Sequence, residues 1–166
     1  MDNHDPGTNR RAVLGVGAAA AVGVLTAATT GSGPAAAAPV DSDRYQRGLD
    51  MLQQVSGDAG LAVIESLREF SPDLARLTVE FPYGDIYSRP QLDLPQRQLV
   101  TIGALVASGD TAPQLEVHLH AALNVGLRPE QIVEAIMQCL PFVGFPRVLN
   151  GIGVARKVFT ARGVAA

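Results

Sequence analysis

After residue 70, one local pattern recurs along this chain: a polar residue, a proline within the next two positions, and then apolar residues at helical spacing. It is found at Ser71-Pro72, Asp93-Leu94-Pro95, Thr111-Ala112-Pro113 and Arg128-Pro129. Proline suits the first turn of a helix, where its missing N–H would have no partner, and it interrupts helix interiors and central strands. No alternating apolar and polar run of useful length is present. The sequence therefore predicts an all-α domain.

Apolar periodicity and breaker residues set the expected elements. We expect a compact domain of roughly five to seven helices, about six, with short connections. The expected helices cover 41–55, 61–70, 72–81 and 95–108, a segment capped by Thr111, a segment from Pro129 to a stop or kink at Pro141, and 144–162. Leu74, Leu77 and Phe81 form a possible core stripe of the helix over 72–81. Because residues 82–90 are rich in breakers, we expect a loop that crosses the domain surface there.

The N-terminus is typical of an export signal. Arg10 and Arg11 precede a weakly hydrophobic stretch of Ala, Gly and Val, and four alanines precede Pro39. This arrangement favours a twin-arginine signal peptide over 1–38 that engages the bacterial twin-arginine translocase. The alternative is an uncleaved membrane anchor, since the apolar stretch is near the lower length limit for a spanning helix. We expect cleavage, a mature domain over 39–166, a secreted or cell-envelope location, and no stable membrane insertion afterwards.

Composition excludes several classes of function. The net charge is −3, and no run rich in Lys or Arg is present, so we expect no nucleic-acid partner. Cys139 is the single cysteine. An internal disulfide and a thiol-pair redox cycle within one chain are therefore impossible. The apolar neighbours of Cys139 favour a buried structural thiol.

His118 is the main candidate for chemistry, because histidine titrates near neutral pH and the chain offers few other groups for proton transfer. At about 100° per residue, His118 falls beside the apolar stripe of its helix. His120 falls on the opposite side, with Glu116 and Asn124. The plain alternative is a histidine at the edge of the core that is satisfied by a backbone carbonyl. Periodicity alone does not separate the two.

Most of the predicted mature domain resembles the carboxymuconolactone decarboxylase family. The segment 83–89 resembles the family's approach to its first core helix. The matching blocks further along are Leu92-Asp-Leu-Pro-Gln-Arg-Gln-Leu-Val-Thr101, Pro113-Gln-Leu-Glu-Val-His118, Ala121-Ala-Leu-Asn-Val-Gly126, Gly144-Phe-Pro146, Asn150 and Ala155-Arg156-Lys-Val-Phe159.

The resemblance implies a small all-helical subunit that forms homo-trimers or homo-hexamers. It also implies a cofactor-free carboxy-lyase or isomerase that removes CO₂ from a carboxylated unsaturated lactone or acts on a related enolisable acid. His118 would be its general acid or base. Related alkylhydroperoxidases of the superfamily carry Cys-x-x-Cys-x-x-x-His on the corresponding helix. Here Thr111 and Gln114 stand in place of the cysteines, so thiol peroxidase activity is not expected.

Other residues of these blocks are candidates for substrate contact. Arg89 and Arg147 could hold a carboxylate in two-pronged fashion, and the alternative is a surface or interface ion pair. Asp85 could orient a histidine or pair with Arg89, and the ion pair is favoured. Phe145 could form a pocket wall or ordinary core, and Asn150 could bind a substrate or a helix end.

Two glutamines complete the candidate set. Gln98 stands where many relatives have a glutamate, and its amide can hold a substrate or orient an imidazole but cannot exchange a proton at neutral pH. Gln114 is a further candidate for substrate binding. We expect no two-histidine metal site within one chain, because His118 and His120 lie on opposite sides of their helix and His4 would be removed with the leader. A histidine cluster across a subunit axis stays open, and we predict no metal or other cofactor.

The function has two alternatives besides the decarboxylase. One is an exported cyclase or isomerase that tailors a secondary metabolite, because the lactones of aromatic degradation are short-lived and made inside the cell. The other is a non-catalytic exported oligomer that binds a small ligand or a partner protein, suggested by Gln98 and the absent cysteines.

Overall fold

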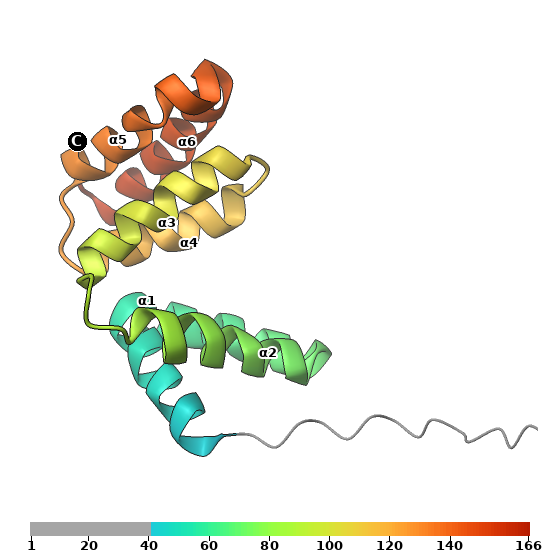
Figure 1. Cartoon of the computed structure of the whole chain (residues 1–166). Coiled ribbons are helices and arrows are strands. Elements are labelled where there is room, and N and C mark those ends of the chain that lie inside the picture. Colours follow the sequence, from blue (N-terminus) through green and yellow to red (C-terminus); the bar gives the residue numbers. More distant parts are fainter. Residues whose placement is uncertain (1–40) are drawn as a thin grey trace, which may run out of the picture. The chain divides into compact units, whose positions relative to one another are not determined.

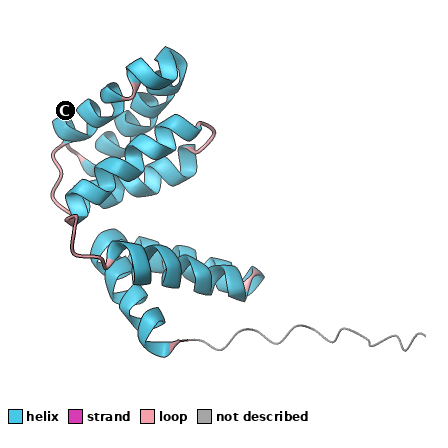
Figure 2. Cartoon of the chain, viewed as in Figure 1, coloured by secondary structure: helices cyan, strands magenta, loops and turns pink. Residues whose placement is uncertain are grey.

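The structure is a computed structural model that describes residues 41–166. All of the regular elements in this range are helices (Figures 1 and 2). The predicted all-α fold is confirmed. The predicted signal peptide lies outside the described residues and stays a prediction. None of the described helices is long and apolar enough to cross a membrane. In chain order, the elements are α1 (Ser42–Phe70), α2 (Pro72–Thr78), η1 (Val79–Tyr87), α3 (Leu94–Ser108), α4 (Ala112–Asn124), α5 (Pro129–Gln138) and α6 (Leu140–Arg162).

Predicted breaks and caps lie at the observed helix ends and kinks. Gly57 has φ 61° and ψ −155°, so it kinks α1 where we expected one helix to end and another to begin. Gly144, with φ 77° and ψ 169°, does the same in α6. Asp93 accepts a hydrogen bond from the Gln96 N–H, and the Gln96 side chain accepts one from the Asp93 N–H, which completes a capping box at α3.

Two apolar clusters form the core of the described residues. One joins α3, α4, α5 and α6 and includes Ile102, Leu119 and Ile136, none of which is exposed. The other joins α1, α2 and η1, and α4 contributes Ala121 to it. Helices α3 and α4 lie side by side (Figure 1). Helix α4 therefore contributes to both clusters.

The predicted loop over 82–90 is wrong for most of its length. Residues Val79–Tyr87 form η1, a π-helix that continues directly from α2 and contains Pro82. The breaker residues are accommodated because the wider π-helical turn changes which backbone groups pair. Only the segment after Tyr87 is irregular before α3 begins.

The predicted core stripe of the third helix is also wrong. Leu74, Leu77 and Phe81 are about half exposed, at 50%, 47% and 58%. Ala75 and Val79 are buried in their place. The buried face thus carries Ala75, Val79 and also Glu80, because this is the face that α1 approaches closely.

Two glycines permit that approach. A Cβ atom on Gly48 of α1 would lie 2.5 Å from the carbonyl oxygen of Val79, and one on Gly84 of η1 would lie 2.7 Å from the carbonyl oxygen of Arg44. Both contacts are to the backbone, which cannot rotate away as a flexible side chain can. The two helices therefore cross at a distance that only glycine allows at these positions.

We expect Gly48→Ala to lower the free energy of unfolding by about 1–3 kcal/mol, because the added methyl must push η1 away from α1. Urea unfolding followed by circular dichroism measures this. Gly153→Ala is the matched control, since a Cβ at this position in α6 meets nothing within 4 Å. Alanine favours helix over glycine, so the control is expected to be neutral or slightly stabilising. Equal effects of the two substitutions would contradict the close crossing.

Candidate functional site

His118 lies on α4 between the two apolar clusters. Leu115 and Leu119, its neighbours on one flank, belong to the cluster of α3–α6, whereas Ala121 belongs to the cluster of α1, α2 and η1. The imidazole is partly buried. The predicted position beside the apolar stripe is thus confirmed. His120 instead lines a separate cleft of about 350 Å³ with Glu116 and Asn124.

The partner of His118 is an amide. The Nδ1 atom of His118 lies 3.1 Å from Oε1 of Gln98, on α3. Gln98 has no exposed surface. Burial lowers the pKa of His118 below its usual value, because removal from water disfavours the imidazolium. The neutral amide brings no charge that would offset this effect, as a carboxylate would.

The hydrogen bonds continue from Gln98 to the end of η1. Gln98 Nε2 lies 3.4 Å from the Tyr87 hydroxyl, and that hydroxyl lies 3.0 Å from Thr101 Oγ1. Thr101 donates in turn to the carbonyl oxygen of Arg97, at 2.9 Å. Sequence analysis missed Tyr87, Thr101 and Arg97. Tyr87 was assigned to a loop. Arg97 and Thr101 lie one residue before and three residues after Gln98 on the same helix, so helical spacing could have indicated them.

Arg97 contacts two parts of the structure next to this hydrogen-bond chain. Its guanidinium carbon lies 5.9 Å from the centre of the Tyr87 ring, within the range of a cation–π contact. Its Nη2 donates to the carbonyl oxygen of Arg89 at 2.6 Å. Arg97 is only 8% exposed. The side chain therefore fixes both the tyrosine ring and the segment that joins η1 to α3.

Stability is expected to depend on the protonation of His118. The folded-state pKa is below the usual value of 6.5, so folding favours the neutral form. The free energy of unfolding should therefore fall as the pH drops below about 6.5, and this loss should level off below the folded-state pKa. Melting temperatures between pH 8 and 5 measure it, with His118→Gln as the comparison. An identical pH dependence in this variant would contradict the assignment.

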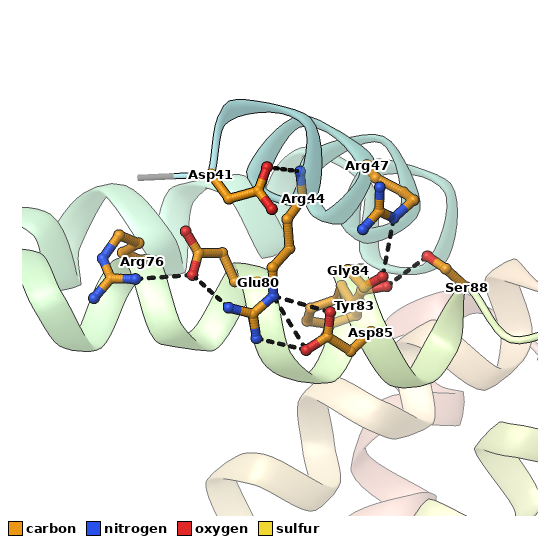
Figure 3. Close-up of polar contacts among 9 residues, drawn as sticks. All are labelled: Asp41, Arg44, Arg47, Arg76, Glu80, Tyr83, Gly84, Asp85 and Ser88. Atoms are coloured by element: carbon orange, nitrogen blue, oxygen red, sulfur yellow. Dashed lines mark hydrogen bonds and ion pairs between the residues drawn. The ribbon is translucent and has the colours of Figure 1, made fainter. Parts of the chain in front are cut away.

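Asp85 lies in a different network, shown in Figure 3. Its two carboxylate oxygens accept from Nε and Nη2 of Arg44 on α1, at 2.9 and 2.5 Å. These hydrogen bonds hold the pKa of Asp85 below its usual value. Nη1 of Arg44 also binds Glu80 at 3.1 Å, and Arg76 binds the same carboxylate oxygen at 2.8 Å. The expected pairing of Asp85 with Arg89 or with a histidine is therefore wrong, because Arg44 occupies both of its oxygens.

Two of the predicted substrate-binding residues share a cleft. Arg147 and Asn150 on α6 line a space of about 340 Å³ together with Lys157 and the start of α4. Arg147 also donates to the carbonyl oxygen of Ala107. The cleft thus presents two cationic side chains, one amide and the carboxylate of Asp110 to a ligand. Leu115 lines it from α4, and His118 does not.

The other predicted site residues are not brought together with His118. Arg89, Gln114 and Phe145 are exposed, and Phe145 keeps 65% of its surface accessible, so it forms no part of the core within this chain. Thr111 precedes α4, but its hydroxyl donates to the Leu105 carbonyl oxygen at 2.8 Å and does not cap the helix.

Cys139 is partly exposed, and not fully buried as we expected. It lines an open apolar groove of about 920 Å³ between α3, α5 and the start of α6. Burial still raises the pKa of its thiol, so a reactive thiolate is disfavoured at neutral pH. Within residues 41–166, no cluster of three His, Cys, Asp or Glu side chains could hold a metal ion.

Comparison with known proteins places this site in a family. The model of the carboxymuconolactone decarboxylase family matches residues 72–157, which include His118 and Gln98. The chain belongs to the carboxymuconolactone decarboxylase family. A 4-carboxymuconolactone decarboxylase of Acinetobacter baylyi is 32% identical to it over 126 residues, which cover 75% of this chain and 93% of that protein.

Two further relatives come from other organisms. A nitrosuccinic acid decarboxylase of Metarhizium robertsii is 25% identical over 68% of this chain and 79% of its own length. Peroxisomal protein 2 of Schizosaccharomyces pombe is 35% identical over 61% of this chain and 47% of its own length. The family match over residues 72–157 runs from the start of α2 into α6 and includes His118 and its hydrogen-bond partners.

Proposed function

We propose that this protein is a cofactor-free decarboxylase of a small carboxylated unsaturated lactone or a related enolisable acid, with His118 as its general acid or base. The observation that carries the proposal is the partly buried imidazole bonded through Nδ1 to the buried amide of Gln98. Such a bond leaves Nε2 as the nitrogen that can exchange a proton with a substrate. Relatives named as decarboxylases, at 25–32% identity, support the reaction class.

The reaction needs one proton and no added electrons. When the bond to the carboxylate breaks, CO₂ leaves and the electron pair moves into the unsaturated lactone, which becomes a dienolate. Protonation of carbon then gives the product, and the imidazolium of His118 is the donor that we assign. Water restores the proton to the imidazole afterwards. Because burial lowers the pKa of His118, its imidazolium is a stronger acid than that of free histidine.

Arg147, Lys157 and Asn150 share one cleft with Asp110, and His118 does not line it. We therefore assign these groups to an anionic ligand of that cleft and not to the substrate atoms that His118 protonates. The role that we assign to Gln98 is to hold the imidazole. Arg89, Gln114 and Phe145 are exposed within this chain, so any role in substrate binding would require a neighbouring subunit. Asp85 is engaged by Arg44, and we assign it no contact with substrate.

The direct test is CO₂ release by the purified full chain without added cofactor. The probes are 4-carboxymuconolactone and nitrosuccinic acid, the compounds in the names of the two decarboxylases. Loss of one carboxylate per CO₂ supports the proposal. A general acid predicts that kcat rises as the pH falls toward the pKa of His118, and a general base predicts the reverse. Saturable binding without turnover of either compound would favour the non-catalytic ligand-binding protein.

We also propose a homo-trimer or homo-hexamer that is exported through the twin-arginine route. Large apolar side chains on the surface of α3 and α6 support self-association, since monomeric proteins rarely expose so many. They include Val100, Phe142, Phe145 and Leu149, each more than 60% exposed. Light scattering of the purified protein tests the oligomer, and fractionation of cells that carry Arg10→Lys and Arg11→Lys tests the route.

A further inference from the structure

The hydrogen-bond chain that ends on His118 begins at a group that can take part in a hydrogen bond in only one role. The backbone carbonyl of Arg97 can only accept, and the Thr101 hydroxyl lies 2.9 Å from it. Threonine in a helix commonly donates to the carbonyl four residues earlier. The Thr101 proton is therefore used at this carbonyl. The Thr101 oxygen keeps its lone pairs, so it can accept a hydrogen bond from the next residue of the hydrogen-bond chain.

The direction of each following bond is then determined. The Tyr87 hydroxyl lies 3.0 Å from Thr101 Oγ1, so the phenol donates its proton there. Burial raises the pKa of Tyr87, so this proton is present at neutral pH. The Tyr87 oxygen is left as an acceptor for Gln98, and only the amide nitrogen of Gln98 can donate. The amide thus turns Nε2 toward Tyr87 and Oε1 toward His118, as observed.

We propose that Tyr87 and Thr101 are positioning residues that fix the tautomer of His118, with hydrogen on Nδ1 and a free lone pair on Nε2. An amide oxygen has no hydrogen to give, so Nδ1 must be the donor. The catalytic meaning of this inference rests on the proposed function, in which Nε2 exchanges the proton. Without the two hydroxyls, the Gln98 amide group could rotate by half a turn and donate from Nε2 to His118. It would then bind the tautomer with hydrogen on Nε2 of the imidazole equally well.

The tautomer can be read directly by nitrogen NMR of the full chain labelled with ¹⁵N-histidine, at pH 8, where His118 is neutral. The ring nitrogen that carries hydrogen and the one that does not differ widely in chemical shift. We expect hydrogen on Nδ1 of His118 in the unaltered protein. Tyr87→Phe and Thr101→Val should shift the population toward hydrogen on Nε2, and Thr101→Ser should restore the original state. His118→Gln assigns the signal.

Thr160→Val is the matched control, because Thr160 makes the same bond to the carbonyl four residues earlier, at 2.9 Å, on the exposed surface of α6. It should leave the His118 signals unchanged. Hydrogen on Nε2 in the unaltered protein would overturn the inference. So would unchanged His118 signals in both Tyr87→Phe and Thr101→Val.

Activity separates this inference from the proposed function. We expect kcat of Tyr87→Phe to fall roughly two- to tenfold with little change in KM, if half to a tenth of the molecules keep the reactive tautomer. The NMR measurement needs no substrate. A tautomer that depends on Tyr87 and Thr101 in a protein that releases no CO₂ would support the positioning role and contradict the decarboxylase. Turnover with a tautomer insensitive to both residues would do the opposite.

Discussion

His118→Gln is expected to lower kcat for CO₂ release by about 100- to 10,000-fold, the usual contribution of a positioned general acid or base. Glutamine is similar in reach and can still donate to Oε1 of Gln98, which accepts from the imidazole in the native protein. It cannot take up or release a proton at neutral pH. The change therefore removes the proton transfer while it keeps the contact between α3 and α4.

The measurement is kcat and KM on the substrate that is turned over, with circular dichroism to show that the variant is folded. His120→Gln is the matched control on the same helix, because His120 lines a different cleft with Glu116 and Asn124. Its activity should stay within a few-fold of the native value. Full turnover in His118→Gln would remove His118 from the mechanism and leave the ligand-binding alternative for this site.

The second large effect concerns stability. Glu80→Gln is expected to lower the free energy of unfolding by about 3 kcal/mol, the lower end of the range for breaking a buried ion pair. Glu80 is 1% exposed, and its carboxylate binds Arg44 at 3.1 Å and Arg76 at 2.8 Å. The amide leaves two guanidinium groups without this shared anion. Arg44 keeps its bonds to Asp85, so the lower end of the range applies.

Urea unfolding measures this loss. Glu65→Gln is the matched control, since Glu65 pairs with Arg68 at 2.9 Å but both side chains are more than half exposed. Surface pairs contribute little, so the control should change stability by less than about 1 kcal/mol. Equal losses in the two variants would show that burial of Glu80 does not govern the strength of its network.

Local sequence rules predicted most of the helices but not the residues that bury their faces. Proline, glycine and capping residues act within one turn, so the ends of α3 and the kinks at Gly57 and Gly144 could be read directly. The π-helix could not. Its wide turns are stabilised by close packing of α1 through Gly48 and Gly84, and those contacts join residues more than 30 positions apart in the chain. For the same reason, Leu74 and Leu77 were assigned to the core and are exposed.

The site shows the same division. Helical periodicity placed His118 correctly beside the apolar stripe, because it depends only on α4. The hydrogen bond between His118 and Gln98 could be anticipated from the family resemblance. The same resemblance showed that Gln98 replaces the glutamate of many relatives. Tyr87 comes from another element, and no rule of spacing connects it to α3. Asp85 was misassigned because its partner, Arg44, lies 41 residues earlier.

Because α4 contributes to two apolar clusters, we expect the proposed chemistry of His118 to depend on local unfolding. A fluctuation that lifts α1, α2 and η1 away from α4 would carry Tyr87 away from Gln98 and admit water to the imidazole. Such openings need less free energy than global unfolding. Amide hydrogen exchange in α1 and η1 and the loss of activity on warming should therefore follow one another, at temperatures where the α3–α6 cluster is still intact. The imidazole then reports whether the N-terminal helices are docked.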